Sequence, residues 1–542
     1  MIRRFAVVAL LASAAPLAAQ SPSLSVETLK EVTRTLSSDT FEGRAPTTPA
    51  EGITIGYVAG RMAAAGLKPG NGGEWFQKVP MVEINANPAM QISVTGGKAP
   101  LSFAYKTDMV AVSYRPVAET KIADSEMVFV GYGINAPERG WNDYKGVDVK
   151  GKTVIILIND PDYEAKDLKG PFEGRAMTYY GRWTYKFEEA ARQGAAAALI
   201  VHDTFPAAYP WGVVVSSWTG PQLSLDPGDK PVEATQANGW ITGDAATQLM
   251  ASAGKSLPQL VAAAKKKGFK AVPLGVKANL SFTNTIRRQA SNNVVGILPG
   301  KTRPDEYVLY SAHWDHLGRC EPVKGDDICN GALDNATGTA GLIALAEAHA
   351  KAGTPDRSIL FLAVTGEESG LLGSAWYGAH PLYPHGKTVA GINMDGLNVV
   401  GRTRDVTVVG AGKSELEPIM ARYAKAQGRV VVPEASPEKG HFYRSDHFSL
   451  AKYGVPMIYF DSGEDLVKGG VAAGHAASED YTVNRYHKPQ DEYREDWNWE
   501  GAVDDLTLNY QIGRELADGT AWPNWYPTAE FRILRDKSRA GK

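Results

Sequence analysis

The sequence predicts an α/β protein with a central, mostly parallel mixed sheet flanked by helices, and with a second, β-rich α/β unit inserted into the chain. Two observations lead to this prediction. The chain has 542 residues, far more than one hydrophobic core usually serves, so more than one domain is expected. From Asn293 onward, short apolar runs alternate regularly with helical patterns, which is typical of a largely parallel sheet.

The first twenty residues have the pattern of a secretory signal. Two arginines precede an apolar stretch over 5–15, and small residues follow it. This stretch is too short to span a bilayer, so we expect a signal peptide at 1–20, cleaved near Ala19 or Gln20, and a secreted or periplasmic protein. No later run of about 18 uncharged apolar residues occurs, so no membrane span is expected.

Residues 21–115 are expected to form the N-terminal part of the main domain. Helical patterns lie at both ends of 26–62, and a loop punctuated by Gly and Pro separates them at 41–49. From 81 to 114 the pattern changes to short alternating strands with turn signals between them.

Residues 116–273 are expected to form the inserted unit. It contains β-rich runs at 127–131, 153–158 and 196–201, and a helical pattern at 184–193 that stops at Gly194. The pair His202–Asp203 follows the last of these runs. We interpret this pair as a strand-end turn rather than a metal site, because no partner ligand lies nearby in sequence.

Residues 285–542 are expected to complete the main domain. Strands are predicted at 294–298, 307–310, 359–364, 389–392, 406–409 and 456–460, and helices at 339–351 and 414–427. In open sheets of this kind, ligands bind at the carboxyl ends of the strands.

Charge and cysteine content narrow the possible classes of protein. The net charge is −3, from 57 Lys and Arg against 60 Asp and Glu, which gives no support for a nucleic-acid partner or a strongly charged substrate. The two cysteines, Cys320 and Cys329, are expected to form a disulfide, because an exported protein matures in an oxidising compartment. The alternative, a thiolate metal pair, lacks the close spacing that zinc sites favour.

Five short segments between residues 311 and 491 carry the chemistry of the chain. Most of them follow a predicted strand, and each offers a His or a carboxylate; they lie at 311–316, 332–338, 365–369, 393–396 and 486–491. Together they supply two His and three carboxylates of the type that zinc accepts, and two further carboxylates. This set suffices for two metal ions that share one ligand, with an acid–base group left over, and such sites hydrolyse amides or phosphates.

Each residue taken alone has an ordinary alternative. His313 and Asp315 share a face of an extended segment, which suits a metal-bound His oriented by a carboxylate, but also a polar strand end. Asp334 could bridge two metals or simply cap the following helix. Two adjacent carboxylates such as Glu367 and Glu368 repel each other, which costs free energy unless a cation neutralises them. The alternative is a solvated turn, in which water and salt screen the two charges.

Asp395 and His487 are single candidates in the last two segments. Asp395 follows a predicted strand, and Pro489 stiffens the loop that carries His487. Either residue could be a satisfied turn residue by itself. The order His, Asp, Glu-Glu, Asp, His along the chain is specific when it is taken as a whole.

With these residues in place, the chain resembles the co-catalytic dizinc exopeptidases, a family that includes aminopeptidase Y, secreted bacterial leucyl-type aminopeptidases and glutamate carboxypeptidase II. The resemblance covers nearly the whole mature chain. The region from Asn293 to the end resembles the peptidase domain, and the loop that contains Arg44 resembles its N-terminal segment. Residues 116–273 resemble the protease-associated domain that many members carry as an insert.

The resemblance implies a role for each motif residue. One zinc would be held by His313, Asp334 and Asp395, the other by Asp334, Glu368 and His487, with Glu367 as general base and Asp315 behind His313. Two Zn²⁺ ions per chain are therefore expected, with a cis peptide bond between Asp334 and Asn335. Arg444 and its neighbour Tyr443 match a segment that lines the substrate pocket, where some aminopeptidases have Tyr at the position of Arg444.

The function implied is a secreted zinc exopeptidase acting on peptides, with an aminopeptidase favoured, in which a metal-bridged water is activated by Glu367. Three alternatives remain: a carboxypeptidase of the glutamate carboxypeptidase type, a glutaminyl-cyclase-like acyl transfer using one zinc, and a non-catalytic binding scaffold. A carboxypeptidase would need Arg side chains to clamp the terminal carboxylate. Arg444 could do this, with Arg402 and Arg404 as candidate helpers.

Overall fold

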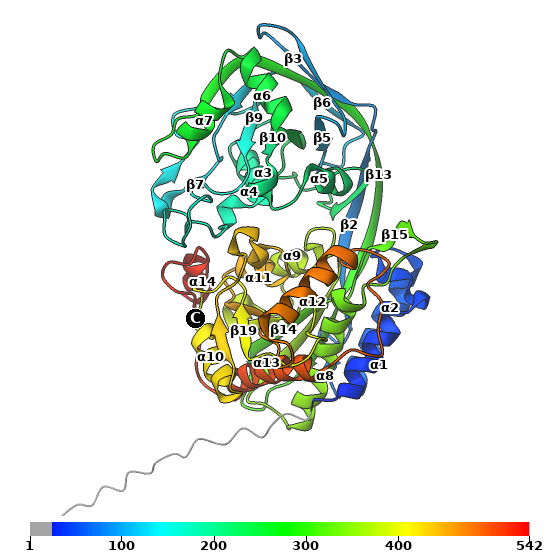
Figure 1. Cartoon of the computed structure of the whole chain (residues 1–542). Helices are drawn as coiled ribbons and strands as arrows, with labels where there is room; N and C mark the ends of the chain where they lie inside the picture. The colour runs from blue at the N-terminus through cyan, green and yellow to red at the C-terminus, as the bar shows by residue number, and fades with distance from the viewer. Residues whose placement is uncertain (1–23, 541–542) are drawn as a thin grey trace, which may run out of the picture.

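The structure of the protein, a computed structural model, describes residues 24–540. These residues form two lobes, one above the other in Figure 1, and the long strands β2 (Phe76–Ala86) and β13 (Val272–Leu298) connect the lobes. The signal peptide expected at 1–20 lies outside the described residues. Within 24–540, no helix combines the length and the apolar character that crossing a membrane requires.

The lower lobe is built on a mixed sheet whose centre is parallel. Besides β2 and part of β13, its strands are β1 (Lys68–Pro69), β11 (Pro221–Leu225), β14 (Arg303–His313), β17 (Arg357–Val364), β18 (Thr388–Asn393), β19 (Asp405–Val408), β20 (Val430–Val432) and β21 (Met457–Ser462). Four neighbours run parallel in the order β17, β14, β18 and β21. β13 pairs antiparallel with β17, and β19 pairs antiparallel with β21. The predicted mostly parallel mixed sheet is confirmed.

Helices cover both faces of this sheet because successive strand residues point to opposite sides. Val308, Tyr310 and Ala312 of β14 enter one core, and Leu309 enters the other. The first core is covered by α1 (Val26–Leu36), α2 (Pro49–Ala64), α8 (Thr337–Lys351), α10 (Leu416–Ala426) and α13 (Glu500–Asp518). The second is covered by α9 (Leu372–Ala379), α11 (His447–Ala451) and the segment before α14 (Arg532–Arg539). Helix α12 (Gly470–Asn484) lies on the surface and buries almost none of its side chains.

The upper lobe has a second α/β sheet. Its strands are β3 (Gln91–Thr95), β4 (Leu101–Ala104), β5 (Met109–Val112), β6 (Glu119–Phe129), β9 (Thr153–Leu157), β10 (Ala197–His202), β12 (Ala237–Thr242) and the first part of β13. Its helices are α3 (Trp183–Arg192), α4 (Thr204–Ala207), α5 (Trp211–Ser217), α6 (Gly243–Ser252) and α7 (Leu257–Ala264). Strands β6, β9, β10 and β12 run parallel in that order.

The strand pairing suggests limits for the upper lobe that differ from the expected 116–273. Strands β3, β4 and β5 were expected in the main domain, but they pair with one another or with β13 and β12 of the upper sheet. Conversely, β11 lies within 116–273 but pairs with β2 of the lower sheet. We therefore propose limits near 87 and 283 for the upper lobe. A short antiparallel strand has the same alternating pattern whichever sheet it joins, so local sequence does not reveal its partner.

The two lobes touch beside the carboxyl ends of the lower sheet. Tyr179 in the 3-10 turn Tyr179–Gly181, just before α3, packs its ring on Tyr443 and Phe448, with centroid distances of 6.2 and 5.2 Å. Lys452 Nζ forms an ion pair with Glu188 Oε1 of α3 at 3.0 Å. The turn before α3 therefore reaches the edge of the lower lobe where ligands of such sheets bind.

Candidate metal centre

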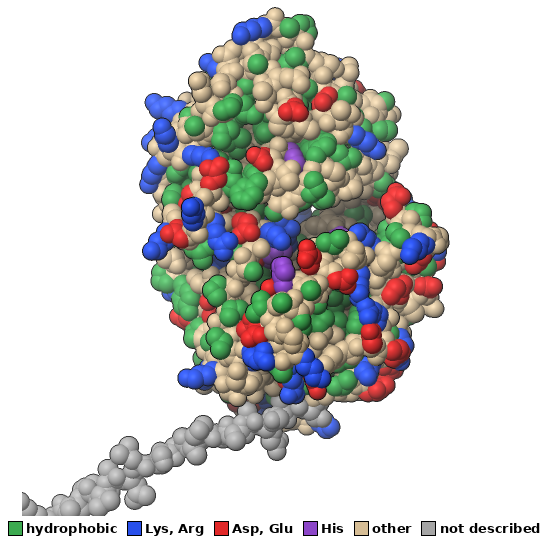
Figure 2. Space-filling model, in the orientation of Figure 1, with side chains coloured by type: hydrophobic (Ala, Val, Ile, Leu, Met, Phe, Trp, Pro, Cys, Tyr) green, Lys and Arg blue, Asp and Glu red, His purple; other side chains and the backbone are tan. Residues whose placement is uncertain are grey.

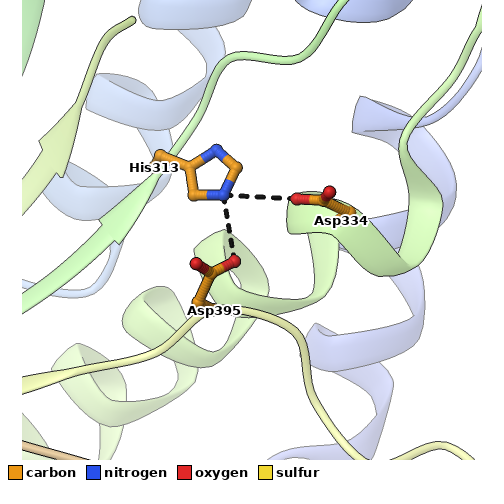
Figure 3. Close-up of side chains that lie close together, drawn as sticks. All are labelled: His313, Asp334 and Asp395. Carbon is orange, nitrogen blue, oxygen red and sulfur yellow. Dashed lines mark hydrogen bonds and ion pairs between the residues drawn. The ribbon is translucent and has the colours of Figure 1, made fainter. Parts of the chain in front are cut away.

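His313 is the last residue of β14 and its side chain is buried, with 1% of its surface exposed. Its Nε2 lies 3.3 Å from Asp334 Oδ1 and 3.1 Å from Asp395 Oδ1 (Figure 3). Asp395 follows β18, the neighbour of β14 in the sheet. The parallel strands β14 and β18 end side by side, so His313 and Asp395 lie close together. The segment before α8 adds Asp334.

A second group forms around the other oxygen of Asp334. His487 Nε2 lies 3.3 Å from Asp334 Oδ2 and 3.0 Å from Glu368 Oε2. Asp334 therefore presents one oxygen to each imidazole, and each imidazole meets one further carboxylate. This is the arrangement that a ligand bridging two metal ions requires.

Asp334 is held by its own segment and by residues far away in sequence. The Asp334–Asn335 peptide bond is cis, as the resemblance implied. The Asn335 side chain accepts hydrogen bonds from the backbone N–H groups of Gly338 and Gly396, both at 2.9 Å. Because Gly396 directly follows Asp395, these bonds tie two ligand-bearing segments together.

Glu367 and Glu368 follow β17, in which every residue is buried. Gly366 has a φ of +65°, a conformation that other residues rarely adopt, and it turns the chain sharply after the strand. The Glu367 backbone N–H donates to Asp315 Oδ1 at 3.2 Å. Carboxylate oxygens of both glutamates lie within 4.8 Å of His313 and of one another, so Glu367 faces the same centre.

Asp315 lies behind His313, as expected, but its carboxylate is not the nearest group. His313 Nδ1 is 3.1 Å from the backbone carbonyl oxygen of Asp315 and 3.8 Å from Asp315 Oδ1. The carbonyl accepts the Nδ1–H and directs Nε2 toward the carboxylates. The Asp315 side chain instead receives the Glu367 backbone N–H.

The protein groups of this centre shift one another's pKa values strongly. Burial alone would lower the pKa of His313, but Asp395 and Asp334 raise it well above its usual value. Against the same effect of burial, Glu368 and Asp334 raise the pKa of His487 to about 10. Burial raises the pKa of Glu367 well above its ordinary range, and neighbouring carboxylates add to this effect.

The same balance acts on two further carboxyl groups. Burial raises the pKa of Asp315 to about 8. Burial would also raise the pKa of Asp334, but contacts with the rings of His313 and His487 lower it well below its usual value. So many buried carboxylates in one place require positive charge among them.

Two imidazoles and three carboxylates are the ligand types that zinc takes in proteins. Several ligand atoms of the centre, Glu368 Oε1 and His487 Nε2 among them, are buried and make no hydrogen bond of normal geometry within the described residues, although each lies at ion-pair distance from a neighbour. Buried polar atoms are normally satisfied, so these atoms fit a bound cation. The residues present therefore fit the zinc ions that the sequence implied.

The structure adds residues to this centre that the sequence did not assign. His316 Nδ1 lies 2.7 Å from Glu368 Oε1, and His316 also groups with Asp334 and Glu368 at ligand distances. The only sequence signal was its place in the motif at 311–316. Arg44 is fully buried and donates to the carbonyl oxygens of Leu36, Trp314, Asn330 and Gly331.

A disulfide joins Cys320 to Cys329 within the hairpin of β15 (Gly318–Val323) and β16 (Asp326–Cys329). This hairpin lies between His313 and Asp334 in the chain. Arg44 donates to the carbonyl oxygens of Trp314 before the hairpin and of Gly331 after it, so both ends of this ligand-bearing segment are fixed.

The residues expected near the substrate differ in their surroundings. The Tyr443 hydroxyl donates to Glu530 Oε1 at 2.9 Å, so its contacts serve the fold. Arg404 pairs with Asp465 at 2.9 Å and Arg402 with Asp504 at 3.4 Å, so neither candidate helper is free to clamp a carboxylate. The Arg444 side chain makes no hydrogen bond or ion pair within 24–540, and its Nε and Nη2 are buried without partners.

Comparison with known sequences identifies the family of this region. Residues 293–511 match the model of peptidase family M28. Aminopeptidase NAALADL1 of Mus musculus is 35% identical over 129 residues, which are 23% of this chain and 16% of that protein. A probable zinc metalloprotease of Pyrenophora teres f. teres is 40% identical over 83 residues, which are 15% of this chain and 17% of that protein. The matches thus span about a sixth of the length of these curated relatives.

Solved structures with a similar outline include two bacterial enzymes. An aminopeptidase from Aneurinibacillus sp. strain AM-1 is 18% identical with a TM-score of 0.49, and covers 91% of this chain and 94% of its own. BSAP, a zinc aminopeptidase from Bacillus subtilis, is 17% identical with a TM-score of 0.42, and covers 93% and 97%. These scores lie below 0.5, so the assignment depends on the family match. The region 293–511, which carries all five predicted zinc ligands, belongs to peptidase family M28.

Proposed function

We propose that this protein is a zinc-dependent aminopeptidase that holds two Zn²⁺ ions per chain and removes single residues from free peptide N termini. One observation carries the proposal: Asp334 directs one carboxylate oxygen to His313 and the other to His487, and Asp395 and Glu368 complete the two groups. A single metal would need only one of these groups. Two groups that share a carboxylate match a co-catalytic pair of metals.

The chemistry follows from the residues that surround this centre. When bound, the zinc ions would supply Lewis acidity that polarises the scissile carbonyl and lowers the pKa of water. Glu367 takes a proton from the attacking water at a carboxylate oxygen and passes it to the nitrogen of the leaving amine. Asp315 helps to place Glu367 by accepting its backbone N–H, and the Asp315 carbonyl orients the His313 ring.

Attack at the N terminus is supported by the excess of acidic groups in the site. A protonated α-amine is attracted by carboxylates in a site of low dielectric constant. Asp395 and Glu367 lie in this centre, beside His313. Aminopeptidase NAALADL1, to which part of this chain is similar, is named for the same direction of attack.

We also propose that the protein is exported and that residues 116–273, most of which lie in the upper lobe, correspond to a protease-associated domain. The signal-like pattern at 1–20 and the disulfide between Cys320 and Cys329 support export, since disulfides persist in oxidising compartments. The strand–helix–strand order of β9, α3 and β10 supports the domain assignment.

The function is tested by a panel of aminoacyl p-nitroanilides and by metal analysis. We expect hydrolysis by the purified protein, loss of activity after chelation, and recovery when Zn²⁺ is returned. Elemental analysis should give two zinc ions per chain. At most one tightly bound ion would contradict the paired centre, and no hydrolysis of any member of the panel would contradict the aminopeptidase.

A further inference from the structure

The upper lobe contains a cavity of its own, at the carboxyl ends of strands β9, β10 and β12. Its volume is about 380 Å³, which is within the range of small-molecule sites. In open α/β sheets, ligands bind beyond the carboxyl ends of the parallel strands. All of the described residues that line this cavity belong to the upper lobe, so the cavity is separate from the metal centre.

Apolar side chains form much of the lining. Leu157 and Ile158 come from the end of β9, and Val201 comes from β10. Leu257 and Val261 of α7 also line the cavity, and because they are four residues apart they share one face of this helix. Both are half-buried. The cavity can therefore hold an apolar side chain.

Two exposed carboxylates share the same lining. Asp203 follows β10, and Asp244 lies in the first turn of α6. Asp203 Oδ1 accepts the backbone N–H of Phe205 at 3.2 Å, whereas the Asp244 carboxylate makes no hydrogen bond or ion pair within 24–540. Among the described residues, no Lys or Arg contributes to the lining. The cavity is therefore negatively charged, and this charge attracts a cation.

A buried tyrosine is a second and independent sign of a ligand. Tyr132 lines the cavity with only 1% of its surface exposed, and its hydroxyl forms no hydrogen bond with any residue among 24–540. Burial raises the pKa of this hydroxyl, and Tyr163 adds to the effect, so the group stays protonated. Buried hydroxyls normally have a partner. The Tyr132 hydroxyl is therefore available to a bound molecule.

His202, the last residue of β10, also lines the cavity and is buried. Its Nε2–H donates to the carbonyl oxygen of Tyr209 at 3.0 Å. Burial lowers the pKa of His202, and the Tyr209 carbonyl and Asp203 oppose this effect. The ring is therefore neutral near neutral pH, with Nδ1 as a hydrogen-bond acceptor. On the face of the upper lobe that Figure 2 shows, a His side chain lies among hydrophobic and Asp or Glu side chains.

The start of α6 adds hydrogen-bond donors to the lining. The first N–H groups of a helix have no partner inside it. Thr242 Oγ1 accepts the N–H of Ala245 at 3.1 Å, but the N–H groups of Gly243 and Asp244 make no hydrogen bond within the described part of the chain. Both of these residues line the cavity, and α6 has ten residues. Such a helix start attracts a carboxylate.

We propose that this cavity binds an amino acid with an apolar side chain by its protonated α-amine. Asp203 and Asp244 hold the amine, with His202 Nδ1 as a neutral acceptor, and the side chain packs on Leu257 and Val261. The amino acid is either free, with its carboxylate at the start of α6, or the N-terminal residue of a peptide. An aminopeptidase meets both, as product and as substrate, but the site does not depend on catalysis.

Hydrogen exchange of the full-length, zinc-loaded protein tests the site, because it reports where a ligand binds. The probes are leucine, leucinol and isocaproate; leucinol lacks the carboxylate and isocaproate lacks the amine. None of them contains an amide bond, so the protein cannot hydrolyse them. We expect leucine and leucinol to slow the exchange of amides in 202–206 and 242–246, and isocaproate to have no effect there. A larger effect of leucine than of leucinol identifies the free amino acid, and an equal or smaller one identifies the peptide N terminus.

Matched variants connect the binding to the named residues. Asp203→Asn and Asp244→Asn should each weaken binding by about 10–100-fold, because hydrogen bonds to charged groups contribute this much. Tyr132→Phe should also weaken binding but melt like the wild type, because its hydroxyl has no partner in the protein to lose. Asp148→Asn is the control, since Asp148 Oδ1 also accepts a backbone N–H two residues later, at 2.9 Å, but lies outside the cavity. It should bind like the wild type.

Three results would overturn the site: exchange at 202–206 and 242–246 that no probe changes, an effect of isocaproate equal to that of leucinol, and binding that is unchanged in both Asn variants. Each of them leaves the aminopeptidase intact, because the p-nitroanilide assay measures that activity independently. If the protein hydrolyses no aminoacyl p-nitroanilide, the proposed function fails, and the exchange experiment still decides the site.

Discussion

The carboxylate of Asp491 holds Asp334 from a position 157 residues away in the chain. Asp491 Oδ2 accepts the backbone N–H of Asp334 at 3.1 Å, and Oδ1 accepts that of Leu333 at 2.9 Å. Asp491 itself is buried and lies four residues after His487. One side chain therefore links the shared ligand of the metal centre to the segment that carries its last ligand.

Asp491→Ala should weaken zinc binding by about 10–100-fold, since residues that orient metal ligands typically contribute this much. The reason is that Asp334 and His487 lose their common anchor. Competition with a chelator of known affinity measures the effect. Asp480→Ala, which removes a surface carboxylate paired with Arg485 at 2.8 Å, is the matched control and should bind zinc normally. Equal zinc affinity in the two variants would show that Asp491 has no such role.

Glu367→Gln should retain zinc but lose at least about 100-fold in kcat, because an amide cannot accept the proton and general-base catalysis contributes 10²–10⁴-fold. Glu368→Gln should instead lose zinc. Paired measurements of kcat and metal content distinguish the two glutamates. Glu492→Gln, at a half-buried position bonded to Asn330, serves as a control for the substitution. A Glu367→Gln rate above a hundredth of wild type would show that another group is the base.

Arg44→Met should destabilise the lower lobe strongly. It would leave four buried carbonyl oxygens without their donor, and an unsatisfied buried group costs about 1–3 kcal/mol. Three of these carbonyls belong to Trp314, Asn330 and Gly331, beside the ligand segments, so zinc content should fall as well. Thermal melting with and without added Zn²⁺ measures both effects. Arg319→Met, an exposed arginine of the nearby hairpin, should melt like the wild type.

Replacing Cys320 and Cys329 together by Ser should lower the free energy of unfolding by roughly 2.7 kcal/mol, the chain-entropy value for a closed loop of about ten residues. The loss should be largest in metal-free protein, where zinc does not hold the ends of the segment. Denaturant unfolding of both forms tests this. Peptide mapping of exported protein without reductant supplies the direct check, and two free thiols there would rule the disulfide out.

The direction of attack is tested with one peptide that is N-acetylated and one that is C-amidated. We expect acetylation to stop cleavage, because it removes the positive charge that the acidic site attracts. Amidation should leave cleavage of a long peptide intact. The reverse result would replace the aminopeptidase with a carboxypeptidase, and Arg444 would then be the candidate to hold the terminal carboxylate.

Much of the fold and of the metal centre could be predicted because both depend on local patterns of residues in the sequence. The apolar runs that form β14, β17 and β18 are set by the residues themselves. In a parallel sheet, residues that follow neighbouring strands must meet at one edge. That rule alone brings Asp395 and Glu368 toward His313. The spacing of Cys320 and Cys329 likewise allowed a short loop to close.

Tertiary structure alone decided the features that depend on residues far apart in the chain. Strands β3 and β5 belong to the upper sheet because they pair with β13 and β12, which lie more than a hundred residues away, and β4 joins it by pairing with β3. The roles of Arg44 and Asp491 depend on hydrogen bonds to backbone groups that are distant in the sequence. Tyr179 packs on Tyr443 only because the two lobes touch there. Periodicity records which face of an element is buried, whereas pairing and charge between remote residues are set by how the elements pack.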